Sequence, residues 1–313
     1  MKAVLFIGGA GFIGSNLIRR FIGCDSFRLF VYEPEKANLD RLRPYADLTI
    51  IRGSLGDGAR LRSIIEENGI DIVVHLASSM VPGSSFSDYA AELKEIVLPS
   101  FDLITYCAEK GIRFVLFSSG GTIYGSRPNY RFRETDMPAP ISYYGLSKQI
   151  LEAHVQLEGR RCGLKYLIVR PSNPYGPGQL LSGRQGLIAV SMGRILADKP
   201  ITIWGDGSNV RDYICITDLA EIFFGLVHGG VENEIVNLGS GCGYSINQVI
   251  DCIRDVCNER PVRIEYADGR QSDVSSIVLD TTKSESMVAY QKKSLHDGIA
   301  AFYEYLKDRE ERV

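Results

Sequence analysis

The sequence has no long hydrophobic run and no excess of charge of one sign. Its longest apolar runs, such as 72-IVVHLA-77, have the length of a strand and are far too short to cross a membrane. The formal net charge is −3, so the chain lacks the positive surface that attracts nucleic acid or an anionic membrane. The stretch 3-AVLFI-7 is too short for a secretory signal and leads directly into glycines. We therefore expect a cytoplasmic protein whose partners are neither nucleic acids nor membranes.

The seven cysteines form no motif that is typical of a metal site. They include no CxxC pair and no cluster with histidine, and their number is odd. Such cysteines are typical of reduced, buried thiols in a cytosolic protein. We expect no metal in this chain.

The first half of the sequence alternates short β-branched runs with amphipathic stretches. The expected strands are 3–8, 28–33, 48–53, 71–77, 113–119 and 165–171, and the expected helices are 12–22, 57–68, 88–110 and 144–162. Strands that are apolar on both faces and alternate with helices predict an α/β fold with a doubly wound, Rossmann-type parallel sheet.

The pattern changes after residue 171 to loops rich in glycine and proline, such as 173-NPYGPGQLLSGRQG-186. We expect residues 1–170 to form the Rossmann domain, with a return segment near 210–240. Residues 171–313 are expected to form mainly a smaller C-terminal lobe that binds the substrate.

The opening stretch 3-AVLFIGGAGFIGSNL-17 carries three glycines between the first strand and the first helix. Gly8 permits a tight turn, Gly11 lets the backbone approach a pyrophosphate, and Gly14 lets the helix pack on the strand. The helix N-terminus then offers free N–H groups to the anion. In this setting the glycines predict that the Rossmann domain binds a dinucleotide.

An acidic residue at the end of the second strand indicates which dinucleotide binds. Glu33 follows Gly14 by nineteen residues and can accept hydrogen bonds from the adenosine ribose hydroxyls. Its charge would repel a 2′-phosphate, which favours NAD over NADP. Lys36 is close enough in sequence to keep NADP open.

Tyr144 and Lys148, in 143-YYGLSKQILEAH-154, are four residues apart and therefore share one face of a helix. Tyrosine titrates near pH 10, so a base near pH 7 needs a pKa shift of about three units, roughly 4 kcal/mol. One cation about 4 Å away supplies about 4 kcal/mol at an effective dielectric constant near 20. Because Lys148 is expected to lie further away, the positive nicotinamide ring of NAD⁺ is needed as a second cation. We predict Tyr144 as the catalytic base and Lys148 as its partner.

Seven motifs spread over nearly the whole chain carry a family resemblance. They are GGAGFIG at 8–14, VVHLA at 73–77, SSGGTIYG at 118–125, YYGLSK at 143–148, RPSNPYGPGQ at 170–179, WGDGSNVRDYI at 204–214 and NLGSG at 237–241. With these motifs the sequence resembles the extended short-chain dehydrogenase/reductase family. Within that family it is most similar to the nucleotide-sugar epimerases, such as the UDP-glucose 4-epimerases.

The resemblance implies roles for further residues. The implied cofactor contacts are Phe12 and Ile13 at the pyrophosphate, Ser54 and Leu55 near adenine, and Leu76, Ala77, Ser78 and Ser172 beside the cofactor. The implied substrate contacts are Gly120 and Asn173 at the sugar nucleotide, Trp204 near the nucleoside, Arg211 and Arg270 at the diphosphate, and Asp273 at the ribose. Arginines suit a diphosphate because a guanidinium offers paired donors to phosphate oxygens.

Three positions depart from the family pattern. Gly120 stands where the epimerases usually carry Ser or Thr beside the catalytic tyrosine. Ser54 stands in place of an Asp that touches adenine, and Ile96 in place of an Asn on the middle helix.

A fourth position separates two kinds of chemistry. The related 4,6-dehydratases and decarboxylases carry an acidic residue two places before the Tyr-Gly pair, where this chain has Thr122. Dehydration needs an acid–base group there, and neither Thr122 nor its neighbour Gly121 can supply it near pH 7. A 4-epimerase needs one base, and Gly120 and Gly121 would leave room for the ketose to turn over. Ser119 or Thr122 could hydrogen-bond the 4-hydroxyl.

We therefore expect NAD-dependent 4-epimerisation of a nucleotide-diphosphate hexose, UDP-glucose/UDP-galactose or their N-acetyl forms, through a transient 4-keto intermediate. Two alternatives stay open: an NAD(P)H-dependent 4-keto-sugar reductase, and a non-catalytic protein that binds NAD(H) as a sensor. Trp204 also suits dTDP or GDP, and the intermediate size of Ile277 leaves N-acetylhexosamines open. The resemblance further implies a homodimer that pairs through the helices 88–110 and 144–162.

Overall fold

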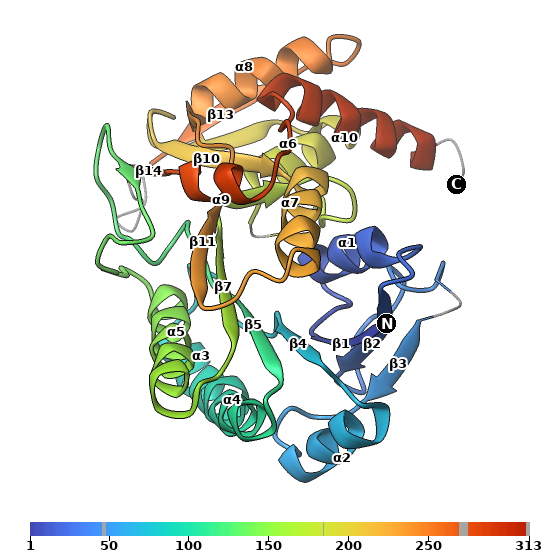
Figure 1. Cartoon of the computed structure of the whole chain (residues 1–313). Coiled ribbons are helices and arrows are strands. Elements are labelled where there is room, and N and C mark those ends of the chain that lie inside the picture. Colours follow the sequence, from blue (N-terminus) through green and yellow to red (C-terminus); the bar gives the residue numbers. More distant parts are fainter. Residues whose placement is uncertain (46–47, 184, 269–274, 311–313) are drawn as a thin grey trace.

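The computed structural model describes residues 1–45, 48–183, 185–268 and 275–310, and a parallel sheet lies at its centre (Figure 1). Within these residues the sheet has seven strands in the order β11-β7-β5-β4-β1-β2-β3, and all neighbouring pairs are parallel. The strands are β1 (Lys2–Ile7), β2 (Phe27–Glu33), β3 (Thr49–Arg52), β4 (Ile72–His75), β5 (Arg113–Phe117), β7 (Tyr166–Pro171) and β11 (Glu234–Leu238).

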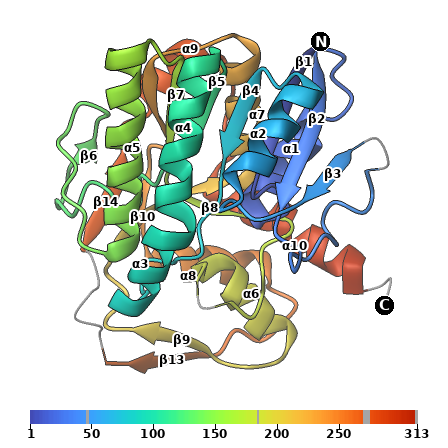
Figure 2. The ribbon, with the colours of Figure 1, turned by 90° about the horizontal axis from the view of Figure 1, so that it is seen from below.

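Helices cover both faces of this sheet (Figures 1 and 2). Along β1, Val4 and Phe6 point into one hydrophobic core and Leu5 and Ile7 into the other, because successive strand residues face opposite sides. The first core is closed by α1 (Phe12–Phe21) and α7 (Ile216–His228), and the second by α2 (Gly58–Asn68), α4 (Leu98–Lys110) and α5 (Tyr143–Cys162). The predicted doubly wound α/β fold is confirmed.

Most of the remaining described elements build a second lobe beside the C-terminal ends of the main strands. A smaller sheet orders β12 (Gly243–Ser245), β10 (Val210–Cys215), β14 (Ser276–Leu279) and β6 (Arg131–Phe132), and β8 (Asn173–Tyr175) pairs with β10. A ribbon of β9 (Ile201–Trp204) and β13 (Ile264–Ala267) and the helices α6 (Leu187–Leu196), α8 (Ile246–Val256), α9 (Thr282–Met287) and α10 (Leu295–Glu310) complete it.

The last strand of the main sheet comes from beyond most of this lobe in sequence. The chain runs through β10 and α7 before β11 pairs with β7, with Ile235 opposite Ile168. The sheet edge at β7 is therefore closed by a segment that lies more than sixty residues further along the chain.

The stretch expected as one helix over 88–110 is divided into three parts. These are α3 (Phe86–Glu92), a π-helical turn η1 (Leu93–Val97) and α4. The cause is Pro99, which has no N–H to donate and whose ring clashes with the carbonyl group four residues earlier. The N–H of Leu98 accordingly bonds to the carbonyl of Leu93, five residues back.

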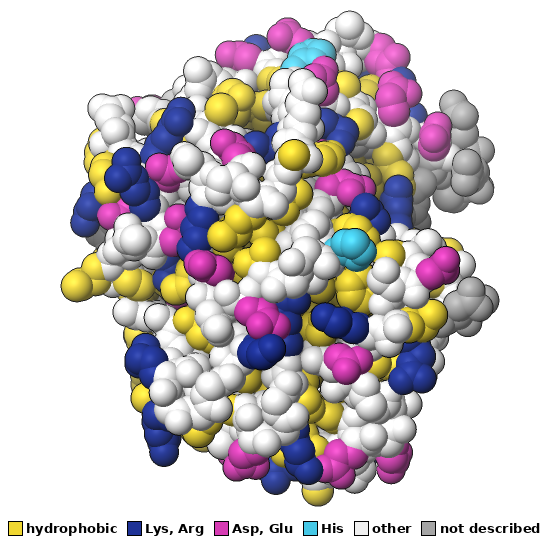
Figure 3. Space-filling view, in the orientation of Figure 1, with side chains coloured by type: hydrophobic (Ala, Val, Ile, Leu, Met, Phe, Trp, Pro, Cys, Tyr) yellow, Lys and Arg dark blue, Asp and Glu magenta, His cyan; other side chains and the backbone are white. Residues whose placement is uncertain are grey.

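No helix in the described part of the chain is both long enough and apolar enough to span a bilayer. On the molecular face seen in Figure 3, acidic and basic side chains are interspersed among apolar ones.

Candidate active site

The glycine turn after β1 forms a cradle at the C-terminal edge of the sheet. Gly8 adopts a φ of +81°, and a Cβ there would lie 3.0 Å from the backbone nitrogen of Ala77, so this position requires glycine. At Gly14 an added Cβ would lie 2.6 Å from the Cα of Gly9. Both glycines therefore allow the turn, α1 and the loop after β4 to approach one another closely.

The first turn of α1 can bind an anion. Its N-cap residue, Gly11, is exposed and has no side chain that could cap the first N–H groups of the helix. Phe12 and Ile13 follow it, and the turn contains no acidic residue. Unsatisfied N–H groups and the positive end of the helix dipole favour a phosphate group here.

Two charged side chains flank the cradle, and the sequence analysis identified only Glu33. Its buried carboxylate ends β2 and accepts a hydrogen bond from the N–H of Ala10 at 2.6 Å. Burial raises the pKa of this carboxyl group, and the Ala10 bond partly opposes the shift. Arg41, from the loop after β2, donates to the carbonyls of Gly178 at 2.9 Å and Ala10 at 3.5 Å. Arg41 belongs to no recognisable motif, so only the fold brings it to the cradle.

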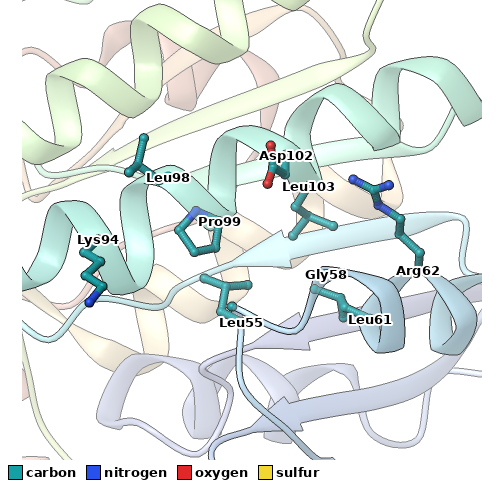
Figure 4. Close-up of a pocket in the computed structure, with 10 residues that line it drawn as sticks. Leu55, Gly58, Leu61, Arg62, Lys94, Leu98, Pro99, Asp102 and Leu103 are labelled. Carbon is teal, nitrogen blue, oxygen red and sulfur yellow. The ribbon is translucent and has the colours of Figure 1, made fainter.

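Leu55 lines a pocket of about 220 Å³ between α2 and α4 (Figure 4). Side chains of both helices border it: Leu61 and Arg62 from α2, and Leu98, Pro99, Asp102 and Leu103 from α4. Ser54 is exposed beside it, and its carbonyl accepts a hydrogen bond from the Tyr32 hydroxyl at 2.9 Å. Its wall combines leucine and proline side chains with the charged Arg62, Lys94 and Asp102, and such a mixed space suits a flat ring that carries polar edges.

Tyr144 and Lys148 lie in the first two turns of α5, and the Lys148 Nζ is 5.7 Å from the centroid of the Tyr144 ring. Burial lowers the pKa of Lys148 to about 8, although the carboxylates of Glu92 and Glu152 oppose this shift. Burial raises the pKa of Tyr144 to about 12. A hydrogen bond with Ser119 lowers this pKa and the charge of Glu92 raises it further. At pH 7 the structure therefore holds a neutral phenol beside an ammonium group.

Polar atoms without partners gather where β4, β5 and β7 end. The buried Oγ1 of Thr122, the Oγ atoms of Ser118 and Ser172, and the Nδ1 of His75 have no hydrogen-bond partner among the described residues. Buried polar groups in native proteins are nearly always paired. These atoms therefore leave unused hydrogen-bonding capacity at this edge of the sheet.

Residues 4–239 match the model of the NAD dependent epimerase/dehydratase family. This chain belongs to that family. The predicted resemblance is therefore confirmed, and it extends through the main sheet to the end of β11.

Individual relatives cover nearly the whole chain. The chain is 31% identical over 304 residues to a dTDP-4-dehydro-6-deoxyglucose reductase of Escherichia coli, covering 95% of both proteins. It matches the crystal structure of UDP-glucose 4-epimerase with UDP-glucose from Thermotoga maritima with a TM-score of 0.90 and 29% identity, over 98% of this chain and 99% of that one. For the UDP-glucose 4-epimerase of Thermus thermophilus in complex with NAD, the TM-score is 0.88 and the identity 28%, over 97% and 99% of the chains.

The loop after β4, which the family resemblance puts beside the cofactor, is tied to the cradle and to α3. The N–H of Leu76 bonds to the carbonyl of Ile7 at 2.9 Å, and Ala77 adjoins Gly8. The hydroxyl of Ser78 donates to the carboxylate of Glu92 at 2.8 Å. Glu92 is buried, and its charge acts on Tyr144 and Lys148. It was not predicted, because a single glutamate in an amphipathic helix is no signal of burial.

Gly120 differs from what the sequence led us to expect. We expected Gly120 to leave room for a sugar, yet a Cβ there would lie 2.6 Å from a Leu279 methyl group and 2.9 Å from the carbonyl oxygen of Arg170. Leu279 therefore occupies the space that a side chain would fill. Gly121 is more open, since its added Cβ would come no closer than 3.5 Å, to the Asn173 side chain.

Three of the predicted substrate residues, Asn173, Trp204 and Arg211, lie on strands of the second lobe. Asn173 opens β8, donates to the carbonyl of Asp212 at 2.8 Å and lines a pocket of about 110 Å³. Trp204 ends β9 and is 41% exposed, and Arg211 lies on β10. Arg270 and Asp273 lie outside the described residues.

Ile277 was expected near the substrate, where its size would affect the fit of an N-acetyl group, but it lies in a buried core. It is 1% exposed and packs in a small core with Ile123, Tyr124, Phe132 and Leu279. A side chain buried in this way cannot contact an N-acetyl group directly. The size of Ile277 therefore does not by itself decide whether N-acetylhexosamines fit.

Proposed function

We propose that this chain is an NAD-dependent nucleotide-sugar 4-epimerase that acts on UDP-hexoses through a transient 4-keto sugar. The observation that carries the proposal is the pairing of Tyr144 with the buried Lys148 on α5. Membership of the family and the two UDP-glucose 4-epimerase structures support it.

The residues at the sheet edge fit NAD. Gly8, Gly14 and the first turn of α1 (Gly11, Phe12 and Ile13) would hold its diphosphate, and Glu33 would accept a ribose hydroxyl. Ser54 and Leu55 would border the adenine end, and Leu76, Ala77, Ser78 and Ser172 the rest of the cofactor. When bound in its oxidised form, NAD supplies a positive charge near the phenol and accepts and returns the hydride of C4.

Tyr144 would remove the proton of the sugar 4-hydroxyl and later return it. Its pKa of about 12 means that the ammonium of Lys148 alone does not make it a base at pH 7, so a second nearby cation is required. Ser119 is hydrogen-bonded to Tyr144 and would orient the phenol. Thr122, whose hydroxyl has no partner among the described residues, is the other candidate for contact with the sugar.

The second lobe would hold the nucleotide while the sugar turns over. Asn173 lies beside Gly121 and would contact the sugar nucleotide, Trp204 would lie near the base and Arg211 at the diphosphate. Arg270 and Asp273 are proposed for the diphosphate and ribose by family resemblance alone.

The test is interconversion of UDP-glucose and UDP-galactose by the purified protein without added cofactor, with UDP-N-acetylglucosamine assayed beside it. Tyr144→Phe should retain no more than a few per cent of the turnover, because the hydroxyl that moves the proton is gone. Turnover that persists in this variant would refute the assignment. Absence of turnover with every sugar nucleotide would favour the protein that only binds NAD(H).

A second candidate is a 4-keto-sugar reductase. The 31% identity to a relative of that name favours it, and a Tyr144 that is protonated at pH 7 suits donation of a proton to a ketone. A reductase would oxidise one NADH or NADPH for each molecule of product. It would form no epimer when the reduced cofactor is left out. The assay above separates the two reactions by that requirement.

We also propose a homodimer formed through α4 and α5. Both helices expose apolar side chains, Leu98 on α4 and Leu157 on α5, and between them the Phe101 and His154 rings stack at 4.2 Å. A cytoplasmic location remains a proposal based on the cysteine pattern of the sequence.

A further inference from the structure

The carboxylate of Glu92 is buried beside the catalytic pair and has no part in the mechanism above. It ends α3, directly before the π-helical turn, and is 1% exposed. One oxygen accepts the Ser78 hydroxyl at 2.8 Å, and the other accepts the N–H of Ser79 at 2.8 Å and its hydroxyl at 2.6 Å. Glu92 therefore fixes the loop that follows β4.

Two stacked rings hold α3 against α5 at this point. Tyr89 of α3 lies on Tyr143 of α5, with 5.2 Å between ring centroids and 19° between the ring planes. Tyr89 is three residues before Glu92, on the same side of the helix, and Tyr143 directly precedes Tyr144. The stack therefore holds α3, which carries Glu92, against the first turn of α5, where Tyr144 lies. From this place the charge of Glu92 acts on both Tyr144 and Lys148.

The other charged groups around the pair already have partners or carry no charge. Glu152, one turn after Lys148 on α5, forms a buried ion pair at 2.6 Å with Arg170 of β7. His75 of β4 is neutral, because burial lowers its pKa to about 3. Among the described residues that act on Lys148, Glu92 is the carboxylate without an arginine partner.

We propose that Glu92 is the counter-ion of the Tyr144–Lys148 pair and a positioning residue for it, and that its charge sets the pH range in which the site works. The effect on the pH range of turnover rests on the proposed function, whereas the effect on the titration of Lys148 does not. Glu92 does not touch substrate, since its carboxylate is buried and committed to Ser78 and Ser79.

The sign of the effect follows from the charge. The negative charge of Glu92 raises the pKa of both Lys148 and Tyr144. Neutralising it should lower both values by about one unit. Turnover needs Tyr144 without its proton and Lys148 with its own, so both limbs of the pH profile should move to lower pH. A mere loss of packing would reduce turnover without this paired displacement.

The decisive measurement follows the Lys148 side chain by NMR in protein labelled with ¹³C-lysine, without substrate. The Lys148 signal is assigned with Lys148→Arg. Glu92→Gln should titrate Lys148 about one pH unit below the wild type, and Glu92→Met should do the same. Met is the second neutral variant, because it has a similar volume and no charge. It leaves the donors of Ser78 and Ser79 without their acceptor, so circular dichroism first establishes that the variant is folded. Glu95→Gln, an exposed glutamate three residues later, is the matched control and should leave the titration unchanged.

A folded neutral variant in which Lys148 titrates as in the wild type would overturn the proposal. So would an equal shift in Glu95→Gln. Ser79→Ala keeps the charge and removes one of the bonds that hold it, so its Lys148 titration should stay close to that of the wild type. Because the titration needs no turnover, failure of the epimerase assay would leave this test intact.

Discussion

At the scale of single residues, the site depends on which hydroxyl serves Tyr144. The structure pairs Ser119 with the phenol, one position before the residue where related epimerases carry Ser or Thr. Ser119→Ala should therefore lower kcat by about 10²-fold, as expected when one preorganised hydrogen-bond donor is removed. Steady-state kinetics on the proposed substrate will measure this loss.

Thr122→Val is the matched comparison. Ser119, and not Thr122, is hydrogen-bonded to the Tyr144 phenol, so the isosteric change should leave kcat within about fivefold. Stability should be unchanged or higher, because the Thr122 hydroxyl has no partner to lose among the described residues. If Thr122→Val were instead the more damaging variant, Thr122 and not Ser119 would replace the hydroxyl that related epimerases carry at position 120.

The predictable part of the site is the part that a local pattern encodes. Tyr144 and Lys148 follow from their spacing on one helix, and the glycines follow from their place between a strand and a helix. Glu92 and Arg41 could not be predicted, because each reaches the site through contacts between segments distant in sequence. The phenol of Tyr144 is also harder to ionise than its sequence indicates, because burial and the charge of Glu92 raise its pKa from 10.0 to about 12.

At the scale of elements, the loop after β5 packs against β14 at Gly120, which lies against the side chain of Leu279. Gly120→Ala should lower the free energy of unfolding by about 1–3 kcal/mol, because the added methyl group overpacks this contact. Gly121→Ala, whose methyl group would have 3.5 Å of clearance, should cost less. Urea unfolding of both variants measures the difference.

The same contact can be tested by coupling. In a Leu279→Ala background the cost of Gly120→Ala should fall, because the methyl group that it strikes is gone, although the carbonyl of Arg170 remains at 2.9 Å. Equal costs in both backgrounds would show that Leu279 is not what excludes a side chain from position 120.

The helix that contains Pro99 shows where element prediction fails. Hydrophobic spacing predicted one helix over 88–110, and the extent is nearly correct, because α3 begins at Phe86 and α4 ends at Lys110. The periodicity does not reveal the π-helical turn, which arises from the missing N–H and the bulky ring of one proline.

At the scale of the whole molecule, we expect two chains to associate through α4 and α5. Light scattering at micromolar concentration should give twice the 34.7 kDa mass of the chain. Glu in place of either Leu98 or Leu157 should weaken the dimer, because a charge would be buried in an apolar contact.

Leu180→Glu provides the control. Leu180 is 64% exposed and lies outside both helices, so its substitution should leave the mass unchanged. A wild-type protein that scatters as a monomer would remove the proposed interface.

The late arrival of β11 has a consequence for synthesis of the chain on the ribosome. Until residue 238 has emerged, β7 presents an unpaired row of N–H and C=O groups, although the other six strands of the sheet are complete by residue 171. A nascent chain in this state can pair with a neighbouring polypeptide and aggregate. Any fragment that stops short of β11 should therefore need a chaperone, however well its own six strands are formed.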